Sequence, residues 1–197
     1  MAGKKSEIKR QTILRAALDA FSEKGFADTR MDDIAARAQV AKGTLYLYFS
    51  SKEALLSAIA SHAAAELHAA IEAAAAETDL TLREKLEKIL DPILEENDEF
   101  QTARVLRLIW AEGLRRPELV SDLFERFVVP MVIKGEIFRE LQSEDGLPEA
   151  VQRYPMLLLA PVIQGILWQG ICGKTVSLDL RDFYSSYLNM IFPPRQS

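Results

Sequence analysis

The sequence predicts an all-α protein with about nine helices: an N-terminal three-helix head holding a helix-turn-helix, joined by a long helix to a helical body. Hydrophobic residues make up 49% of the 197 residues, which is enough for a sizeable core. Apolar residues recur every three or four positions, and no alternation typical of strands persists. Residues 30–49 show this helical spacing with one break, as two short helices joined by a tight turn would. We expect the head over residues 1–52 and the body over residues 53–197.

The first helix is expected at about Ser6–Lys24. Gly25 supplies its stop, and Phe26 turns back towards the core. The apolar residues at helical spacing along it are Ile8, Ile13, Leu14, Ala17, Leu18 and Phe21.

The next two helices are expected at about Met31–Ala38 and Lys42–Phe49, separated by a turn at Gln39–Ala41. Thr29 is expected to cap the earlier of the two, with Asp32 as the acidic partner of a capping box. The residues between the apolar positions face outward, as in a helix-turn-helix whose second helix enters the major groove of DNA. The expected inward contacts are Ile34, Ala35, Ala38, Val40, Leu45 and Tyr48.

The fourth helix is long: Ser50 or Ser51 caps it, and its alanine-rich stretch from Ala54 to Glu77 has high helix propensity. Glycines and prolines mark the boundaries that follow. The body helices are expected at about Thr81–Asn97, Asp98–Leu114, Pro117–Ser143, Pro148–Gly173 and Leu180–Phe192.

Charge is distributed unevenly along the chain. Residues 1–55 hold ten Lys and Arg against seven Asp and Glu, a net charge of +3, whereas the remainder carries −8 of the total of −5. A basic head on an acidic body is typical of a DNA-binding unit attached to a sensing or dimerising unit. The basic N-terminal arm could add contacts to DNA, although a disordered terminus is the simpler interpretation; it holds Lys4, Lys5, Lys9 and Arg10.

These residues resemble a known family. The pattern that carries the resemblance is Gly25-Phe26-x-x-Thr29, then Asp33-Ile34-Ala35, then Val40-x-Lys42-Gly43-Thr44-Leu45-Tyr46-x-Tyr48-Phe49-x-x-Lys52-Glu53-x-Leu55. It is similar to the DNA-binding head of TetR-family transcriptional regulators and covers roughly the first quarter of the chain. The rest resembles the family only in length and helical content. The resemblance implies an all-α homodimer that a small molecule releases from double-stranded operator DNA.

The outward residues of the head are the expected DNA contacts. Lys42 can reach a guanine edge or a phosphate, Thr44 can meet a thymine methyl, and Lys52 at a helix N-terminus can bind a phosphate. Taken singly, surface lysine and arginine are usually solvated charges, but their place on this face favours contacts. The full expected set is Arg30, Lys42, Gly43, Thr44, Tyr46, Tyr48 and Lys52.

Two positions depart from the family pattern. Gln39 stands where glycine is usual, so a left-handed backbone there costs about 1 kcal/mol. Ala41 stands where serine would cap the third helix, and the lost cap costs ~1 kcal/mol. Neither departure breaks the motif.

Prolines inside the apolar helices of the body predict kinks, and kinked helices can leave a cavity for a mainly apolar or aromatic effector. An inward Arg104 would favour an anionic effector. The alternative is that the same residues are ordinary core. The expected lining is Phe100, Arg104, Arg107, Leu108, Trp110, Glu112, Phe124, Phe127, Met131 and Trp168.

The last two helices are candidates for a homodimer interface, because their apolar surface is almost uncharged. Burial within one subunit is the alternative. The expected interface residues are Gln164, Gly165, Trp168, Tyr184, Tyr187, Leu188 and Ile191.

Other classes of protein lack support in the sequence. His62 and His68 stand six residues apart on one helix and make a poor metal pair, and no phosphate-binding loop or nucleophile motif occurs. We therefore expect no enzyme, metal or cofactor. A single cysteine, Cys172, and the absence of a long uncharged apolar run predict a cytoplasmic protein that does not span a membrane.

Three functional hypotheses follow. The favoured one is a ligand-responsive regulator, a repressor, that binds a palindromic operator as a homodimer. The second is a DNA-binding regulator without a small-molecule ligand, controlled by a protein partner. The third is a helical enzyme or adaptor that retains the head as an assembly module.

Overall fold

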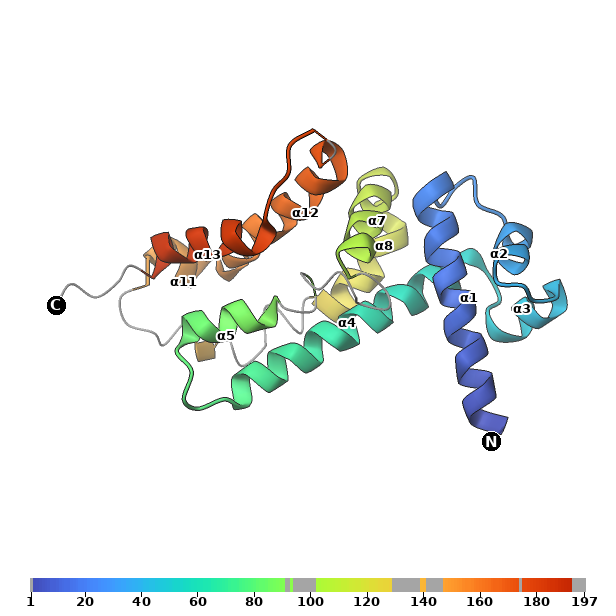
Figure 1. Cartoon of the computed structure of the whole chain (residues 1–197), viewed down its shortest axis with the longest axis horizontal. Coiled ribbons are helices and arrows are strands. Elements are labelled where there is room, and N and C mark those ends of the chain that lie inside the picture. Colours follow the sequence, from blue (N-terminus) through green and yellow to red (C-terminus); the bar gives the residue numbers. More distant parts are fainter. Residues whose placement is uncertain are drawn as a thin grey trace.

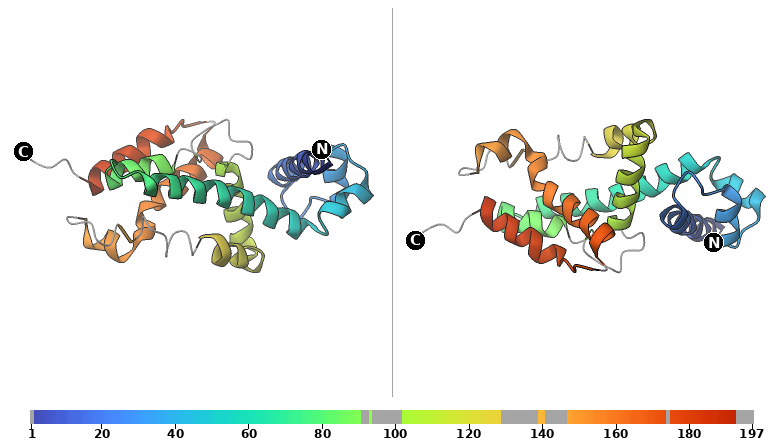
Figure 2. Two further views of the ribbon diagram at one scale, coloured as in Figure 1. Left: turned by 90° about the horizontal axis from the view of Figure 1, so that it is seen from below. Right: turned by 90° about the horizontal axis from the view of Figure 1, so that it is seen from above.

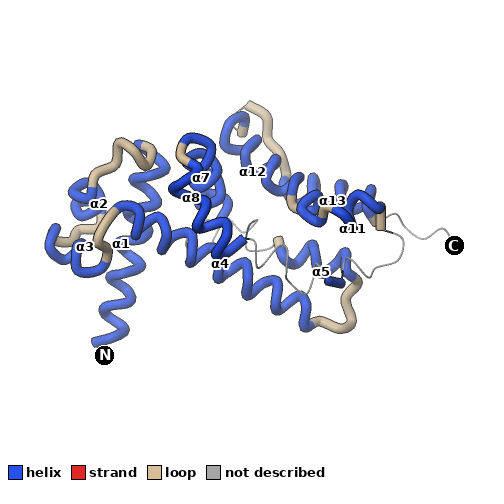
Figure 3. Tube along the Cα trace, turned by 180° about the vertical axis from the view of Figure 1, so that it is seen from behind, coloured by secondary structure: helices blue, strands red, loops and turns tan. Residues whose placement is uncertain are grey.

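The structure is a computed structural model that describes residues 2–90, 93, 102–128, 139–140, 147–173 and 175–192. The all-α prediction is confirmed: the described residues form helices and loops without a strand (Figure 3). The molecule is elongated, with the head at one end and the C-terminal helices towards the other (Figure 1). Two further views show the same separation of head and body (Figure 2).

The head consists of α1 (Ala2–Lys24), α2 (Met31–Arg37) and α3 (Lys42–Tyr48). The first helix begins earlier than predicted, so the basic arm forms its opening turns. Gly25, with φ of 81°, ends this helix, and Phe26 is only 1% exposed, as expected. Ile8, which was expected among the inward apolar residues of this helix, is instead 59% exposed.

The cap of α2 differs from the prediction. Arg30, not Thr29, is the N-cap residue, and its backbone N–H donates to the carboxylate of Asp33 over 3.1 Å. The Thr29 hydroxyl instead donates to the carbonyl oxygens of Ala20 (3.1 Å) and Gly25 (2.7 Å). Thr29 is 1% exposed, so its side chain fastens the loop to α1 and cannot cap α2. Asp32 is therefore not the capping partner.

The turn between α2 and α3 has the predicted strain. Gln39 has φ of 55° and is the only non-glycine residue with positive φ in the described part of the chain. Its backbone N–H donates to Ala36, and the N–H of Val40 donates to Ala35. Ala41 is the N-cap of α3 and offers no side-chain hydrogen bond. The hydrogen bonds of Gln39 and Val40 described here are thus backbone bonds, and Ala41 adds none from its side chain.

The connecting helix α4 (Lys52–Ala76) begins at Ser51, whose hydroxyl accepts a hydrogen bond from the N–H of Ala54 over 3.2 Å. By length and composition it could cross a bilayer, although the sequence predicted no such run. Its mean hydropathy comes largely from alanine, and it leaves the head to run along the body (Figure 1). Leu55, Leu56 and Ile59 on it are at most 1% exposed, as in the core helix of a globular protein.

The body follows α4 with α5 (Leu82–Ile89), which folds back beside it, α7 (Thr102–Arg115) and α8 (Pro117–Leu123). A short π-helix, η1 (Phe124–Val128), continues α8. In the described part of the chain the predicted fifth helix, Thr81–Asn97, is represented by α5, and residues 91, 92 and 94–97 lie outside the described residues. The part of the predicted seventh helix beyond Val128 lies mostly outside the described residues.

The predicted helix Pro148–Gly173 is in fact three elements. These are α11 (Glu149–Arg153), a 3₁₀ turn η2 (Pro155–Leu158) and α12 (Ala160–Cys172). Pro155 and Pro161 each stand in the first turn of a new element, because proline has no N–H to continue the preceding helix. The last helix, α13 (Leu180–Ile191), agrees with the prediction and packs on α12.

Two large apolar clusters hold these elements together. The first combines α1, α2 and α3 with Leu55, Leu56 and Ile59 of α4 and with Val105 and Leu108 of α7. The second lies in the body among α4, α5, α12 and α13. The apolar core of the head thus includes residues beyond residue 52. Side chains of the expected head and of the expected body pack together across the proposed division at that residue.

Candidate nucleic-acid interface and ligand cavity

One face of α3 is open. Leu45 is fully buried beneath the helix, whereas Lys42, Gly43 and Tyr46 are exposed. A side-chain carbon placed on Gly43 would meet no atom within 4 Å, so the backbone there is free to approach another molecule. Thr44 is only half-exposed, at the edge of this face.

The charged residues near this face are held by neighbours. The ammonium of Lys42 lies 2.7 Å from one carboxylate oxygen of Asp32 and 3.0 Å from the other, and this partner raises the pKa of Lys42. Arg30 is exposed at the start of α2. Lys42 can therefore reach DNA only by leaving or sharing Asp32.

Two of the predicted DNA contacts also hold the head together. The ammonium of Lys52 donates to the carbonyl oxygens of Phe26 (2.7 Å) and Ala27 (2.9 Å), and it lies 4.9 Å from the centre of the Phe26 ring. The hydroxyl of Tyr48 shares a hydrogen bond of 3.1 Å with that of Ser6. Both side chains thus have internal roles that the sequence reading missed.

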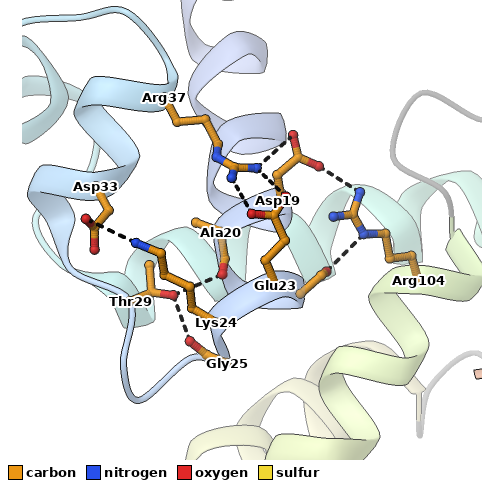
Figure 4. Close-up of polar contacts among 10 residues, drawn as sticks. Asp19, Ala20, Glu23, Lys24, Gly25, Thr29, Asp33, Arg37 and Arg104 are labelled. Atoms are coloured by element: carbon orange, nitrogen blue, oxygen red, sulfur yellow. Dashed lines mark hydrogen bonds and ion pairs between the residues drawn. The ribbon is translucent and has the colours of Figure 1, made fainter. Parts of the chain in front are cut away.

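An ion-pair cluster joins α1 to α2 and to the body (Figure 4). Arg104 of α7 donates to the Asp19 carboxylate over 2.7 Å and to the Ser22 hydroxyl over 2.9 Å. Arg37 pairs with Glu23 and lowers the pKa of that carboxyl group. Arg104 therefore faces the head, and the expectation that it is the polar partner of a ligand is wrong.

Glu112 makes a second bridge from α7 to the head. It is 4% exposed, and one carboxylate oxygen accepts the backbone N–H of Phe26 over 3.3 Å. Its other oxygen pairs with Arg116, whose guanidinium carbon lies 4.9 Å from the centre of the Phe26 ring. Glu112 is thus occupied at the head, and its expected place in the ligand pocket is also wrong.

A cavity does exist in the body, between α4, α7, the α8–η1 junction and α12. Its empty space is about 880 Å³, open mouth included. Trp110 and Phe124 line it as predicted, with their ring centres 5.9 Å apart in an edge-to-face arrangement. Thr102 is the one lining residue with a polar side chain besides the indole N–H of Trp110. The other lining residues are Ala60, Ala63, Ala64, Leu67, Ile93, Val105, Leu106, Ile109, Leu123, Leu159, Val162 and Ile163.

Other residues predicted for this cavity lie elsewhere. Leu108 is buried in the head-side cluster, and Trp168 is 40% exposed on α12. Arg107 lies against Gly170, where burial lowers the pKa of its guanidinium. Phe100 and Met131, and the side chain of Phe127, lie outside the described residues. The sequence reading missed the contribution of α4, although alanines spaced three and four residues apart on one helix are a sign of close packing.

The expected dimer residues divide into two groups. Gly165, Tyr184 and Leu188 are buried, because they pack between α12, α13 and α5 within one chain. Burial raises the pKa of Tyr184. Tyr187 and Ile191 are half-buried, and the Tyr187 hydroxyl donates to the carbonyl oxygen of Leu157. For the buried residues the alternative of burial within one subunit is correct, whereas Gln164 and Trp168 remain exposed.

The head has clear relatives of known family. A family model described as "Bacterial regulatory proteins, tetR family" matches residues 13–59, which include the whole helix-turn-helix. The HTH-type transcriptional regulator RutR of Escherichia coli is 50% identical over 60 residues, 29% of this chain and 28% of RutR. The head of this chain is thus a DNA-binding head of the TetR family.

The similarity of this chain to named regulators is strongest in the head. The uncharacterized regulator YvdT of Bacillus subtilis is 49% identical over 57 residues, 29% of each protein. The regulator BetI of Stenotrophomonas maltophilia is 30% identical over 113 residues, 57% of this chain and 58% of BetI. The matched stretches thus span less than two thirds of these relatives.

Solved structures extend the likeness to the whole fold. A TetR-family regulator from Rhodococcus sp. superposes with a TM-score of 0.70 at 19% identity, covering 93% of this chain and 97% of that chain. A regulator from Aquifex aeolicus superposes with a TM-score of 0.69 at 22% identity, covering 93% and 99%. The family and the relatives are transcriptional regulators, not enzymes. In the described part of the chain no three His, Cys, Asp or Glu side chains gather as metal ligands would.

Proposed function

We propose that this TetR-family chain is a ligand-responsive repressor that binds a palindromic operator in cytoplasmic DNA as a homodimer, and that a small effector releases it. The observation that carries this proposal is the pairing of an open α3 face in the head with an apolar cavity in the body. The same two helices, α4 and α7, both line the cavity and hold the head.

The DNA contacts in this proposal come from the open side of the head. Lys42, Gly43 and Tyr46 lie on the exposed face of α3, with Thr44 at its edge and Arg30 at the start of α2. We assign the first four to the major groove and Arg30 to phosphate. Tyr48 and Lys52 already make hydrogen bonds within the head. They can contact phosphate only with hydrogen-bond donors that these internal bonds do not use.

The effector in this proposal is uncharged and mainly apolar or aromatic. The cavity is lined by alanine, branched aliphatic and aromatic side chains, and no ionised side chain lines it. Burying a charge without a partner is costly, so a carboxylate or ammonium on the ligand would oppose binding. The cavity offers an anionic effector no arginine, because Arg104 pairs with Asp19 and does not line it.

The release step follows from how the cavity walls reach the head. Lys52 at the start of α4 holds the carbonyl oxygens of Phe26 and Ala27, while Arg104 of α7 holds Asp19. An effector that separates α4 from α7 would move these attachments relative to each other. The effector lowers DNA affinity only to the extent that it binds the DNA-free arrangement more tightly.

The dimer interface in this proposal is the exposed side of α12 and α13. Gln164, Trp168 and Ile171 follow one another at helical spacing on α12, and Met190 is 72% exposed on α13. A two-fold axis through this surface would place two copies of the apolar stripe against each other. The two heads would then address two half-sites about one helical turn of DNA apart.

A paired substitution tests the effector site. Ala64 lines the cavity, whereas Ala65 beside it on α4 is exposed. Operator DNA is first selected from random sequences with the purified protein, and apolar compounds that raise the melting temperature are then tested for release of that DNA. A64F should abolish both effects of such a compound and keep operator binding, and A65F should behave like the parent. Operator binding that no compound releases would instead favour a regulator controlled by a protein partner.

A further inference from the structure

One large apolar side chain on α3 faces solvent. Leu47 is 85% exposed, more than any other large hydrophobic residue in the described part of the chain. A single exposed leucine is ordinary on a protein surface. This one, however, stands on the helix that the helix-turn-helix presents outward, beside Gly43 and Tyr46.

The geometry of α3 places Leu47 near the middle of its open face. Successive side chains on an α-helix are about 100° apart, so Tyr46 lies about 60° to one side of Gly43 and Leu47 about 40° to the other. Leu45, which is fully buried, points about 160° away from Leu47. Leu47 is thus closer to the centre of the open face than Thr44, which is half-exposed at its edge.

The occupant of this face is identified by charge and by chemistry. The head carries a net charge of +3 over residues 1–55, which suits a polyanion. Within the major groove of duplex DNA, the 5-methyl group of thymine is the apolar group on a base edge. Lys42 is paired with Asp32 within the protein, whereas the exposed Leu47 side chain is available to contact a base.

We propose that Leu47 is a specificity-determining residue that packs against the 5-methyl group of a thymine in each operator half-site. This inference rests on the proposed DNA-binding function. Gly43, one turn earlier, lets the helix backbone approach the groove closely enough for the leucine to touch a base edge. The side chain of Leu47 then selects thymine over cytosine without a hydrogen bond.

The test removes the methyl group from the DNA and the leucine from the protein. An operator is selected from random duplexes with the full chain, and each thymine in turn is replaced symmetrically by deoxyuracil, which pairs identically but lacks the methyl group. Transfer of one methyl-sized group corresponds to about fourfold in affinity, so the symmetric change should weaken binding about fifteenfold at one position. L47A should bind the parent operator more weakly by at least the same factor, about fifteenfold, and should lose its sensitivity to uracil at that position.

Leu114 supplies a matched control, because it is 79% exposed on α7 of the body. L114A should keep both the affinity and the uracil sensitivity of the parent. The inference on Leu47 is overturned if every uracil-substituted operator binds within about twofold of the thymine form, or if L47A retains the full sensitivity. Failure of the full chain to select any sequence would overturn the DNA-binding proposal itself, and Leu47 with it.

Discussion

Replacing Glu112 should loosen the attachment of the head to the body. Glu112 lies on α7 and is 4% exposed. Its carboxylate accepts a hydrogen bond from the backbone N–H of Phe26 in the head and pairs with Arg116. E112A removes both interactions, whereas E112Q keeps an oxygen that can accept from Phe26. The two variants therefore separate the backbone hydrogen bond from the charge pair.

The magnitude follows from what each variant leaves unpaired. In E112A the buried N–H of Phe26 has no acceptor, which costs about 2 kcal/mol. Arg116 adds little, because its side chain is 35% exposed and can turn to water. E112Q loses only the ionic part and should cost about 1 kcal/mol. For a chain of this length, about 2 kcal/mol corresponds to a fall of roughly 4–8 °C in melting temperature.

Urea unfolding measures this effect directly, at a single protein concentration because a dimer would link stability to concentration. Circular dichroism reports all helices, and the fluorescence of Trp110 and Trp168 reports the body. E72Q is the matched control: Glu72 has a side chain that is 71% exposed, and its loss should stay within about 0.5 kcal/mol. An E112A protein as stable as E72Q would refute the assignment of Glu112 as a clamp on the Phe26 loop.

Three further outcomes are expected. A41S should stabilise the protein by about 1 kcal/mol by capping α3, and S51A should destabilise it by a similar amount by uncapping α4, both measured by urea unfolding. The Arg30 N–H lowers the pKa of Asp33 below 3.8. The stabilisation by this carboxylate is thus complete well above its ordinary pKa of 3.8 and is lost as the pH falls through that value and then through the lower pKa of the folded protein, so the stability difference between parent and D33N should shrink over this range. W168E should turn a homodimer into a monomer by light scattering; an unchanged dimer would exclude Trp168 from the interface.

The head was largely predictable because its signals are local. Apolar spacing, the glycine after Lys24 and the motif around Gly43 placed three helices to within a few residues, except at the start of α1. Gln39 was expected in a left-handed conformation, and its φ is 55°. Thr29 was misread, since a threonine before a helix can cap it or can turn inward, and only the neighbouring carbonyl oxygens of Ala20 and Gly25 decide which.

The body depended on contacts between residues far apart in the chain. Helical spacing identified the apolar side chains of α7, but Leu108 packs under the head while Trp110, two residues later, lines the cavity. Arg104 and Glu112 carry no sequence signal of their partners, because Asp19 and Phe26 are more than 80 residues away. On α12 and α13 some apolar residues pack inside the body and others of the same kind are exposed, and the sequence does not distinguish the two groups.

The sequence by itself therefore determined the helical class, the helix-turn-helix and the strain in its turn, since propensity, capping and periodicity act over a few residues. Only the tertiary structure decided which side chains line the cavity, which join head to body and which remain open to a partner. Those outcomes depend on how α7 lies between α1, α4 and α12, and a helix with apolar residues on more than one side can be packed in several ways.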